Sequence, residues 1–238
     1  MDCKRIGTEA VIGSFEADGI NAKWMFHKSK IHGTVTVEGS EAKNMFLRAE
    51  IHENAKVTVE GSTARNIMFD KAEIHGTVTV ENSNADNEMF LRAEIHENAE
   101  VKIEGSKATW RIFDRAEIHE NAEVKIENTE AGHMFFNAKI HGTVKIEGSK
   151  TGNMFHHDEI RGTVTVEGLE AKNMFNYAEI HKECTELSLI GANAKSFFEG
   201  AKFEESKKPL TIKYRDTKLP KIISEKRKII LEELPREE

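Results

Sequence analysis

Apolar residues follow one pattern that repeats along most of this chain. Each repeat contains a Met-Phe pair or its equivalent, then Ala-x-Ile, then an alternating Val-x-Val or Val-x-Ile segment. Alternation of β-branched and polar residues is typical of short β-strands with one buried face. No helical period or hairpin spacing interrupts the pattern, so we expect three short strands in each repeat.

Phenylalanines mark the repeat, and successive members stand 20 to 23 residues apart. They are Phe26, Phe46, Phe69, Phe90, Phe113, Phe135, Phe155, Phe175 and Phe198. Repeats of this length that consist of short strands indicate a parallel β-helix, whose coils stack about 4.8 Å apart. We predict an all-β parallel β-helix solenoid of nine to ten coils over residues 1–203. The coils are longer than the 18 residues of left-handed hexapeptide coils, which favours a right-handed winding.

Two features of the repeat predict its corners. One column after the Val-x-Val segment contains only Gly or Asn, which readily adopt positive φ. Its members are Gly39, Gly61, Asn82, Gly105, Asn128, Gly148 and Gly168. The second feature is variable length, because "IHGTV" in some coils becomes "IHENAKV" or "IHENAEV" in others. Insertions preserve strand register only at turns, so the histidine marks a turn.

Residues 204–238 differ from the repeat, since they contain all three prolines and many basic residues. We predict an extended stretch followed by a short amphipathic helix, in a tail that covers the last coil or binds a partner. The apolar residues on one face of this helix are candidates for interaction: Ile222, Ile223, Ile229, Ile230 and Leu234.

Composition excludes several classes of function. A net charge of −7 argues against binding nucleic acid through its phosphates. No apolar run approaches the roughly 20 residues that span a bilayer. Cys3 and Cys184 form no ligand pattern, and we find no secretory signal or phosphate-binding loop. We therefore expect a cytoplasmic protein without a cofactor.

A histidine column is the first candidate for chemistry, because imidazole is a common metal ligand. Its members are His32, His52, His75, His96, His119, His141 and His181, and Arg161 interrupts it. A linear column does not converge on one ion as a zinc site requires. We interpret it as a structural ladder that stacks and bonds turn carbonyls, with metal or surface binding as a minor alternative.

Three further columns have structural interpretations. Glutamates follow Val-x-Val, with Lys102, Lys125 and Lys145 placed to offset their charge. Asparagines before the Met position predict a ladder of amide hydrogen bonds. The methionines form either an outward apolar stripe or, as we favour, a buried column beside the phenylalanines at a bulged corner. The glutamates are Glu38, Glu60, Glu81, Glu104, Glu127, Glu147 and Glu167, and the asparagines are Asn44, Asn66, Asn87, Asn153 and Asn173.

Departures from the repeat are the better place to search for a site. The segment "MFHHDEIRG" places His156, His157 and Asp158 near Arg161, and these four residues are a candidate polar site. The sequence shows no nucleophile, base and orienting group in a recognisable set. We therefore name no catalytic residue.

The segments "HGTVTVEG" and "HGTVKIEG" resemble those of parallel β-helix proteins and faintly those of bactofilins. The bactofilin resemblance implies a β-helical polymer that binds no nucleotide. Independently, the repeat begins near Ile6, so Val11 and Phe15 belong to a poorly covered first coil. Exposed strand edges invite pairing, which predicts a head-to-head dimer. We expect a non-catalytic scaffold that binds itself or another protein, and the alternative is a polysaccharide-directed enzyme or binding module.

Overall fold

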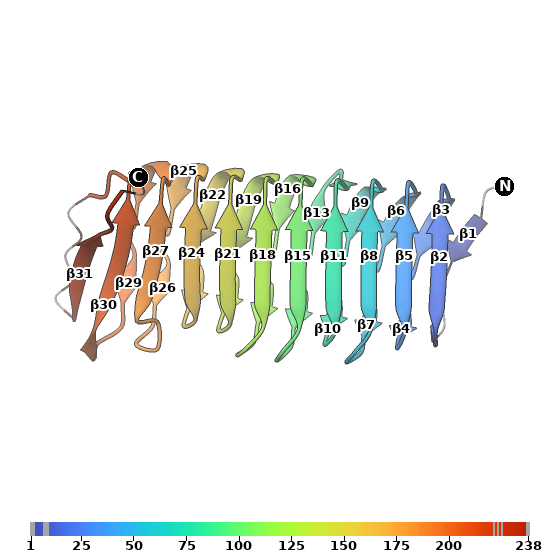
Figure 1. Cartoon of the computed structure of the whole chain (residues 1–238), viewed down its shortest axis with the longest axis horizontal. Helices are drawn as coiled ribbons and strands as arrows, with labels where there is room; N and C mark the ends of the chain where they lie inside the picture. The colour runs from blue at the N-terminus through green and yellow to red at the C-terminus, as the bar shows by residue number, and fades with distance from the viewer. Residues whose placement is uncertain (1–2, 7–9, 221, 223, 225, 237–238) are drawn as a thin grey trace.

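The chain forms a parallel β-solenoid of about ten coils, with its two ends at opposite ends of the long axis (Figure 1). The computed structural model describes residues 3–6, 10–220, 222, 224 and 226–236. These residues contain no helix, and their strands pair in parallel. The predicted all-β parallel solenoid is therefore confirmed, while its right-handed winding stays a prediction.

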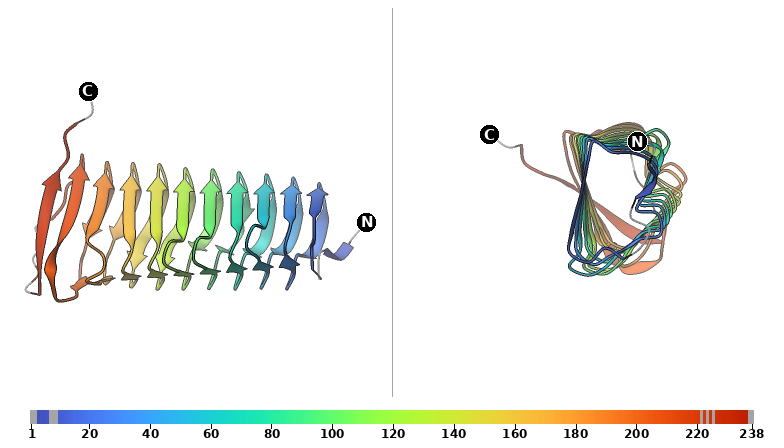
Figure 2. Two further views of the ribbon diagram at one scale, coloured as in Figure 1. Left: turned by 60° about the horizontal axis from the view of Figure 1, so that its bottom comes forward. Right: turned by 90° about the vertical axis from the view of Figure 1, so that its right-hand side faces the viewer.

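Three sheets run the length of the solenoid, and every coil except those at its two ends contributes to all three (Figure 2). Sheet A contains β1 (Cys3–Ile6), β3 (Asn21–Met25), β6 (Glu41–Met45), β9 (Thr63–Met68), β12 (Asn84–Ala85), β13 (Glu88–Met89), β16 (Lys107–Ile112), β19 (Glu130–Phe136), β22 (Lys150–His156), β25 (Glu170–Met174) and β28 (Asn193–Phe197). Sheet B contains β4 (Lys30–Ile31), β7 (Glu50–Ile51), β10 (Glu73–Ile74), β14 (Glu94–Ile95), β17 (Glu117–Ile118), β20 (Lys139–Ile140), β23 (Glu159–Ile160), β26 (Glu179–Ile180) and β29 (Lys202–Phe203). Sheet C contains β2 (Ser14–Asp18), β5 (Thr34–Glu38), β8 (Lys56–Glu60), β11 (Thr77–Glu81), β15 (Glu100–Glu104), β18 (Glu123–Glu127), β21 (Thr143–Glu147), β24 (Thr163–Glu167), β27 (Glu186–Ile190), β30 (Ser206–Arg215) and β31 (Arg227–Glu233).

The corner between sheets C and A has the left-handed residue that the Gly/Asn column predicts. Gly39, for example, has φ 53° and Asn82 has φ 49°. A buried hydroxyl follows each of these residues in most coils. The Ser62 hydroxyl donates to the Glu60 carbonyl at 2.9 Å and accepts from the Ser40 N–H at 3.1 Å. These bonds satisfy backbone groups that the turn would otherwise bury without partners.

The corner between sheets A and B is also left-handed, which the sequence did not predict. Each phenylalanine of the repeat has positive φ, and Phe46 has φ 53°. This conformation turns the chain after Met45, so that Met45 and Phe46 are both fully buried. The interpretation that buries both columns is confirmed, although a left-handed residue makes the corner. Bulky residues rarely adopt this conformation, and burial of the ring offsets its cost.

The phenylalanines form a continuous stack inside the solenoid. Ring centroids of successive members from Phe26 to Phe198 are 4.6 to 5.1 Å apart. Burial of one such side chain contributes about 1.5 to 3 kcal/mol. The stack therefore matches the spacing of the hydrogen-bonded coils and supplies a large share of the core.

The tail differs from our expectation of an amphipathic helix, because Arg227–Glu233 form strand β31. Strand β30 pairs with β27 and β31 pairs with β30, so the tail extends sheet C beyond residue 203. Adjacent β-branched residues at Ile229 and Ile230 favour a strand once an open sheet edge is available. Local periodicity alone could not reveal this edge. Ile223 lies outside the described residues.

A buried arginine holds the tail against the solenoid. Arg227 is 2% exposed, and its guanidinium donates to the carbonyls of His181 at 2.8 Å and Cys184 at 2.6 Å. It also donates to the carbonyls of Lys208 at 3.1 Å and Pro209 at 3.3 Å. These bonds join β31 to the preceding coils and compensate for burial of the charge.

Candidate functional site

The histidine column lies at the turn between sheets B and C, as its variable length predicts. The rings of His32 and His52 stack at 3.8 Å, and those of His75 and His96 stack at 3.9 Å. Burial lowers the pKa of His52, His96 and His141, which favours neutral rings. The expected stacking is confirmed for these pairs, and neutral rings can stack without charge repulsion.

Two clusters in this region contain metal-ligand atoms within 4.8 Å of one another. In the first, the rings of His75 and His96 beside Glu73 are only 10° from parallel. The nitrogen lone pairs lie in the ring planes, so two stacked rings direct them side by side and not toward one ion. This stacked arrangement therefore suits a structural ladder better than a metal site.

The second cluster contains His181, Glu183 and Glu204. Arg161 lies 3.5 Å from Glu183, and Lys182 lies 3.8 Å from Glu204. The His181 Nδ1 lies 3.2 Å from the Glu204 carboxylate. Because cationic side chains already balance both carboxylates, this cluster has little electrostatic attraction left for a metal ion.

The structure does not bring together the predicted polar site. His156 and His157 contact Tyr177, whose ring stacks on His157 at 5.1 Å. Asp158 instead points into the core, where its Oδ1 accepts from the Ala138 N–H at 2.7 Å. Burial raises the pKa of Asp158 well above its ordinary value. Arg161 lies at the far end of β23 and pairs with Glu183. Sequence proximity was misleading here because the chain turns within this segment: β22 ends at His156, His157 has φ 63° at the corner, and Arg161 follows β23.

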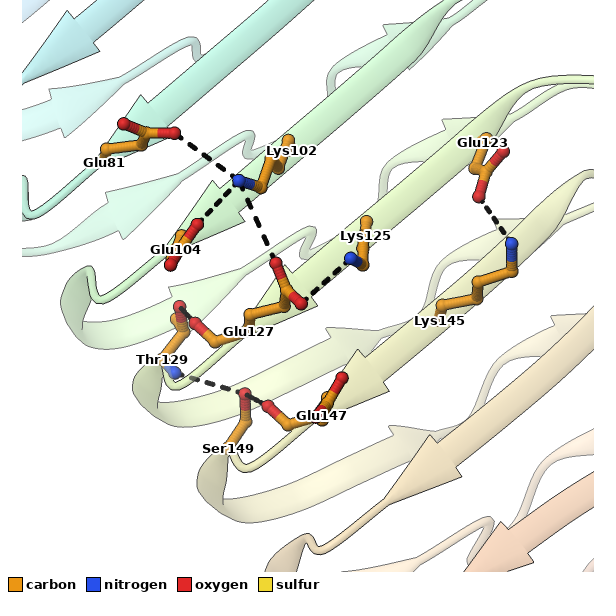
Figure 3. Close-up of polar contacts among 10 residues, drawn as sticks. All are labelled: Glu81, Lys102, Glu104, Glu123, Lys125, Glu127, Thr129, Lys145, Glu147 and Ser149. Carbon is orange, nitrogen blue, oxygen red and sulfur yellow. Dashed lines mark hydrogen bonds and ion pairs between the residues drawn. The ribbon is translucent and has the colours of Figure 1, made fainter.

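The glutamate column forms part of an ion-pair lattice on the outer face of sheet C (Figure 3). Lys102 Nζ lies 2.6 Å from Glu104, 3.5 Å from Glu81 and 4.0 Å from Glu127. Lys125 also pairs with Glu127, at 2.9 Å. The prediction that these lysines offset the glutamates is therefore confirmed in this part of the sheet.

The asparagine column forms side-chain hydrogen bonds along the axis. Asn66 donates to Asn44 at 2.9 Å, and Asn87 donates to Asn66 at 2.5 Å. Asn173 donates to Asn153 at 2.8 Å. The amides therefore satisfy one another, as the structural interpretation predicts.

Turn lengths create a cleft beside the histidine column. Two short turns at Gly142 and Gly162 lie between longer turns that carry Glu120 and Glu183, and they form the floor of a cleft of about 560 Å³. A Cβ atom on Gly162 would lie 1.9 Å from the Gly142 carbonyl oxygen, so only glycine fits this close approach. The lining offers carboxylates, threonine hydroxyls and the Arg161 guanidinium, which suit a polar ligand. The turn lengths are visible in the sequence, but their position side by side requires the coil register.

Both ends of sheet C have apolar side chains near an open edge. At the first coil, Ile6, Val11 and Phe15 are half-buried against the core, while Ile12 is 84% exposed. At the other end Ile222 and Ile229 pack against the core, Ile230 and Leu234 are half-buried, and Leu231 is 42% exposed. These residues remain candidates for interaction.

Sequence reasoning missed a column of basic residues at the corner between sheets A and B. The second residue after each phenylalanine is basic in five successive coils. These residues are Lys28, Arg48, Lys71, Arg92 and Arg115. Each has positive φ, between 52° and 58°. The repeated letters "RAEIH" and "KAEIH" were the available signal.

No protein-family model, curated protein or solved structure matches the chain. The likeness to bactofilins therefore stays a prediction, and the fold rests on the coil geometry alone. The described residues include no helix with the length and apolarity needed to cross a bilayer.

Proposed function

We propose that the protein is a non-catalytic scaffold that associates through the edge of its first coil. The observation that carries this proposal is the position of β2 at the margin of sheet C, where it pairs only with β5 among the described residues. The Gly13 carbonyl accepts from the Thr34 N–H, so odd-numbered residues direct their backbone groups toward β5. Alternation leaves the backbone groups of Ser14, Glu16 and Asp18 on the open side.

The expected partner is a second copy in a head-to-head arrangement. Two β2 edges related by a twofold axis run antiparallel, and their free N–H and C=O groups can then pair. The exposed Ile12 side chain lies beside this edge and adds apolar surface. The buried free thiol of Cys184 is compatible with the reducing cytoplasm that we propose as the compartment.

Substitution of Glu16 by proline tests this contact, because it removes an edge N–H that pairs with no described strand. Sedimentation at about 0.5 M salt, where ionic contacts are screened, should show a dimer for the native chain and a monomer for Glu16→Pro. Glu16→Gln keeps the N–H and is the matched control, so it should remain dimeric. A Glu16→Pro protein that folds and still dimerises would refute the proposal.

A second candidate function is binding of a polysaccharide in the cleft above Gly142 and Gly162. The favouring observation is the polar lining, in which Glu120, Arg161 and Thr163 can bond hydroxyl groups. Affinity electrophoresis in gels that contain neutral or acidic polysaccharides tests this function. Retardation by one polymer that Arg161→Ala abolishes would support it, and equal mobility in all gels would contradict it.

A further inference from the structure

Four successive coils present the same three outward side chains, which we call the RAEIH face. The segments are residues 48–52, 71–75, 92–96 and 115–119. In each segment Ala and Ile are buried, while the basic residue, Glu and His face outward. The face therefore has a basic, an acidic and an imidazole column side by side.

Backbone hydrogen bonds hold the basic and acidic columns at one common spacing. The Arg48 N–H donates to Asp70 and the Arg92 N–H donates to Asp114, each at 2.8 Å, in the next coil. Glu73 pairs in register with Glu50 on one side and Glu94 on the other. Both columns thus repeat once per coil, about every 4.8 Å.

The basic column has no ionic partner in the part of the chain that the structure describes. Among the described residues, none forms an ion pair within 4.0 Å with Arg48, Lys71, Arg92 or Arg115. Asp70 is 8% exposed and lies in the field of three of these cations, but its carboxylate accepts no hydrogen bond from their side chains. Like charges in one row repel each other, so a partner that supplies anions at the same spacing would be stabilising.

We propose that the RAEIH face binds the RAEIH face of a second copy, with the two solenoids parallel and side by side. A twofold axis along the solenoid places the basic column of each copy opposite the acidic column of the other. The same coil repeat sets the spacing of the basic column and of the acidic column. When the two copies are aligned coil by coil, each basic residue of one copy therefore lies opposite a glutamate of the other. This pairing deepens the proposed scaffold function but uses a different surface from the β2 edge.

A second copy fits this face better than a linear polyanion does. The four cations and the four glutamates of the face cancel in net charge. Lys30 and Lys139 already pair with Glu50 and Glu117 at the two ends of the acidic column. Among the described residues Glu73 and Glu94 pair with no lysine or arginine, so the two middle coils offer the carboxylates for a partner.

The basic column also has carboxylates on both sides, with Glu94 in the acidic column and Asp70 and Asp114 across the corner. Asp70 and Asp114 are buried, and Asp114 pairs with Arg111, so the exposed acidic column is what a polyanion would meet. That column would repel a polyanion, whereas a second copy offers stripes of both signs.

Charge exchange between the columns tests the proposal. K71E/R92E makes both columns acidic over two coils, and E73K/E94K makes both basic. Each variant alone should be monomeric in sedimentation equilibrium at about 0.05 M salt, because like columns then face each other. Their mixture should form a heterodimer at least as tight as the dimer of the Glu16→Pro parent, in which all these variants are made. The dimer of this parent should weaken about tenfold or more at about 0.5 M salt.

K23E/K43E is the matched control, because it reverses two exposed lysines on sheet A by the same charge. It should dimerise like the native chain, and circular dichroism should show that all variants are folded. A monomeric Glu16→Pro parent at low salt, a mixture that stays monomeric, or equal weakening by K23E/K43E would each overturn the proposal. All these sedimentation measurements use the Glu16→Pro background, in which the β2 contact is removed. A failure of the RAEIH pairing can therefore be distinguished from a failure of the proposed β2 contact.

Discussion

Two faces of the solenoid carry lysine or arginine and glutamate in columns of the same spacing. Among the described residues, the basic column forms ion pairs on only one of these faces. On sheet C, Lys102 and Glu104 lie two residues apart on a straight strand, so their side chains emerge on one face and pair at 2.6 Å. On the RAEIH face, Arg92 and Glu94 are also two residues apart, but Arg92 occupies a left-handed corner with φ 52°. Arg92 therefore does not share a straight strand with Glu94, and no ion pair joins the two residues. Backbone conformation therefore decides whether a basic residue and the glutamate two positions later form an ion pair within the chain.

Both faces cover one aromatic core, so the largest loss of stability should come from the core and not from either face. Phe113→Ala removes one ring from the stack and should reduce the free energy of unfolding by about 3 to 5 kcal/mol. Phe136→Ala is the matched control, because Phe136 is half-buried outside the stack. Urea denaturation should show a much smaller loss for this control. Equal losses would mean that the stack does not dominate stability.

The two faces should also differ in the pH at which they lose stability. Burial lowers the pKa of His96 on the RAEIH face, so unfolded chains take up this proton first as the pH falls below about 6.5. The stability that depends on neutral His96 is complete above that pH and is lost as the pH falls through the lower folded pKa. On sheet C, the hydrogen bond from Lys102 lowers the pKa of Glu104, so this stability is lost only below about 4.5.

Thermal denaturation between pH 7 and pH 5 checks this difference. The melting temperature of the native chain should fall by a few degrees over that range, and His96→Gln should reduce the fall. Lys102→Met should leave this decrease in melting temperature unchanged, because the stability that depends on the pKa of Glu104 is lost only below about pH 4.5. A native melting temperature that is constant down to pH 5 would contradict the assignment of the histidine column.

Single truncations provide the finest comparison of the two faces. Lys102→Ala removes contacts with three glutamates and should lower the free energy of unfolding by a small but measurable amount. Arg92→Ala removes an unpaired cation and should change the stability of the monomer by less than about 0.5 kcal/mol. Denaturation at about 0.5 M salt keeps association out of the comparison. If Arg92→Ala lowers the free energy of unfolding as much as Lys102→Ala does, then Arg92 also has a stabilising ionic partner within its own chain.

Sequence periodicity was enough to predict the coils, because each buried position repeats. Alternation at Val78 and Val80 predicts a strand, and Gly39 predicts a left-handed corner; both are confirmed. The second corner was missed because Phe46 adopts a conformation that phenylalanine favours only when the surrounding core holds it there. Strand β31 was missed because its conformation depends on the edge that β30 provides.

The candidate sites were harder to predict than the fold. The histidine column was located correctly, since it sits at the turn of variable length. The grouping of His156, Asp158 and Arg161 was wrong, because it considered distance along the chain and ignored the direction of each side chain. The basic column containing Arg92 escaped notice because unpaired charges are visible only when the neighbouring coils are in place.

Small-angle X-ray scattering of the Glu16→Pro variant at low salt tests the central claim most directly, because it measures mass and length together. Side-by-side pairing of RAEIH faces predicts twice the monomer mass with a maximum dimension close to that of one solenoid, whose ten coils span about 50 Å. Addition of salt to about 0.5 M should return the monomer mass at nearly the same length. A monomer mass at low salt, or a doubled mass with a doubled length, would contradict the account.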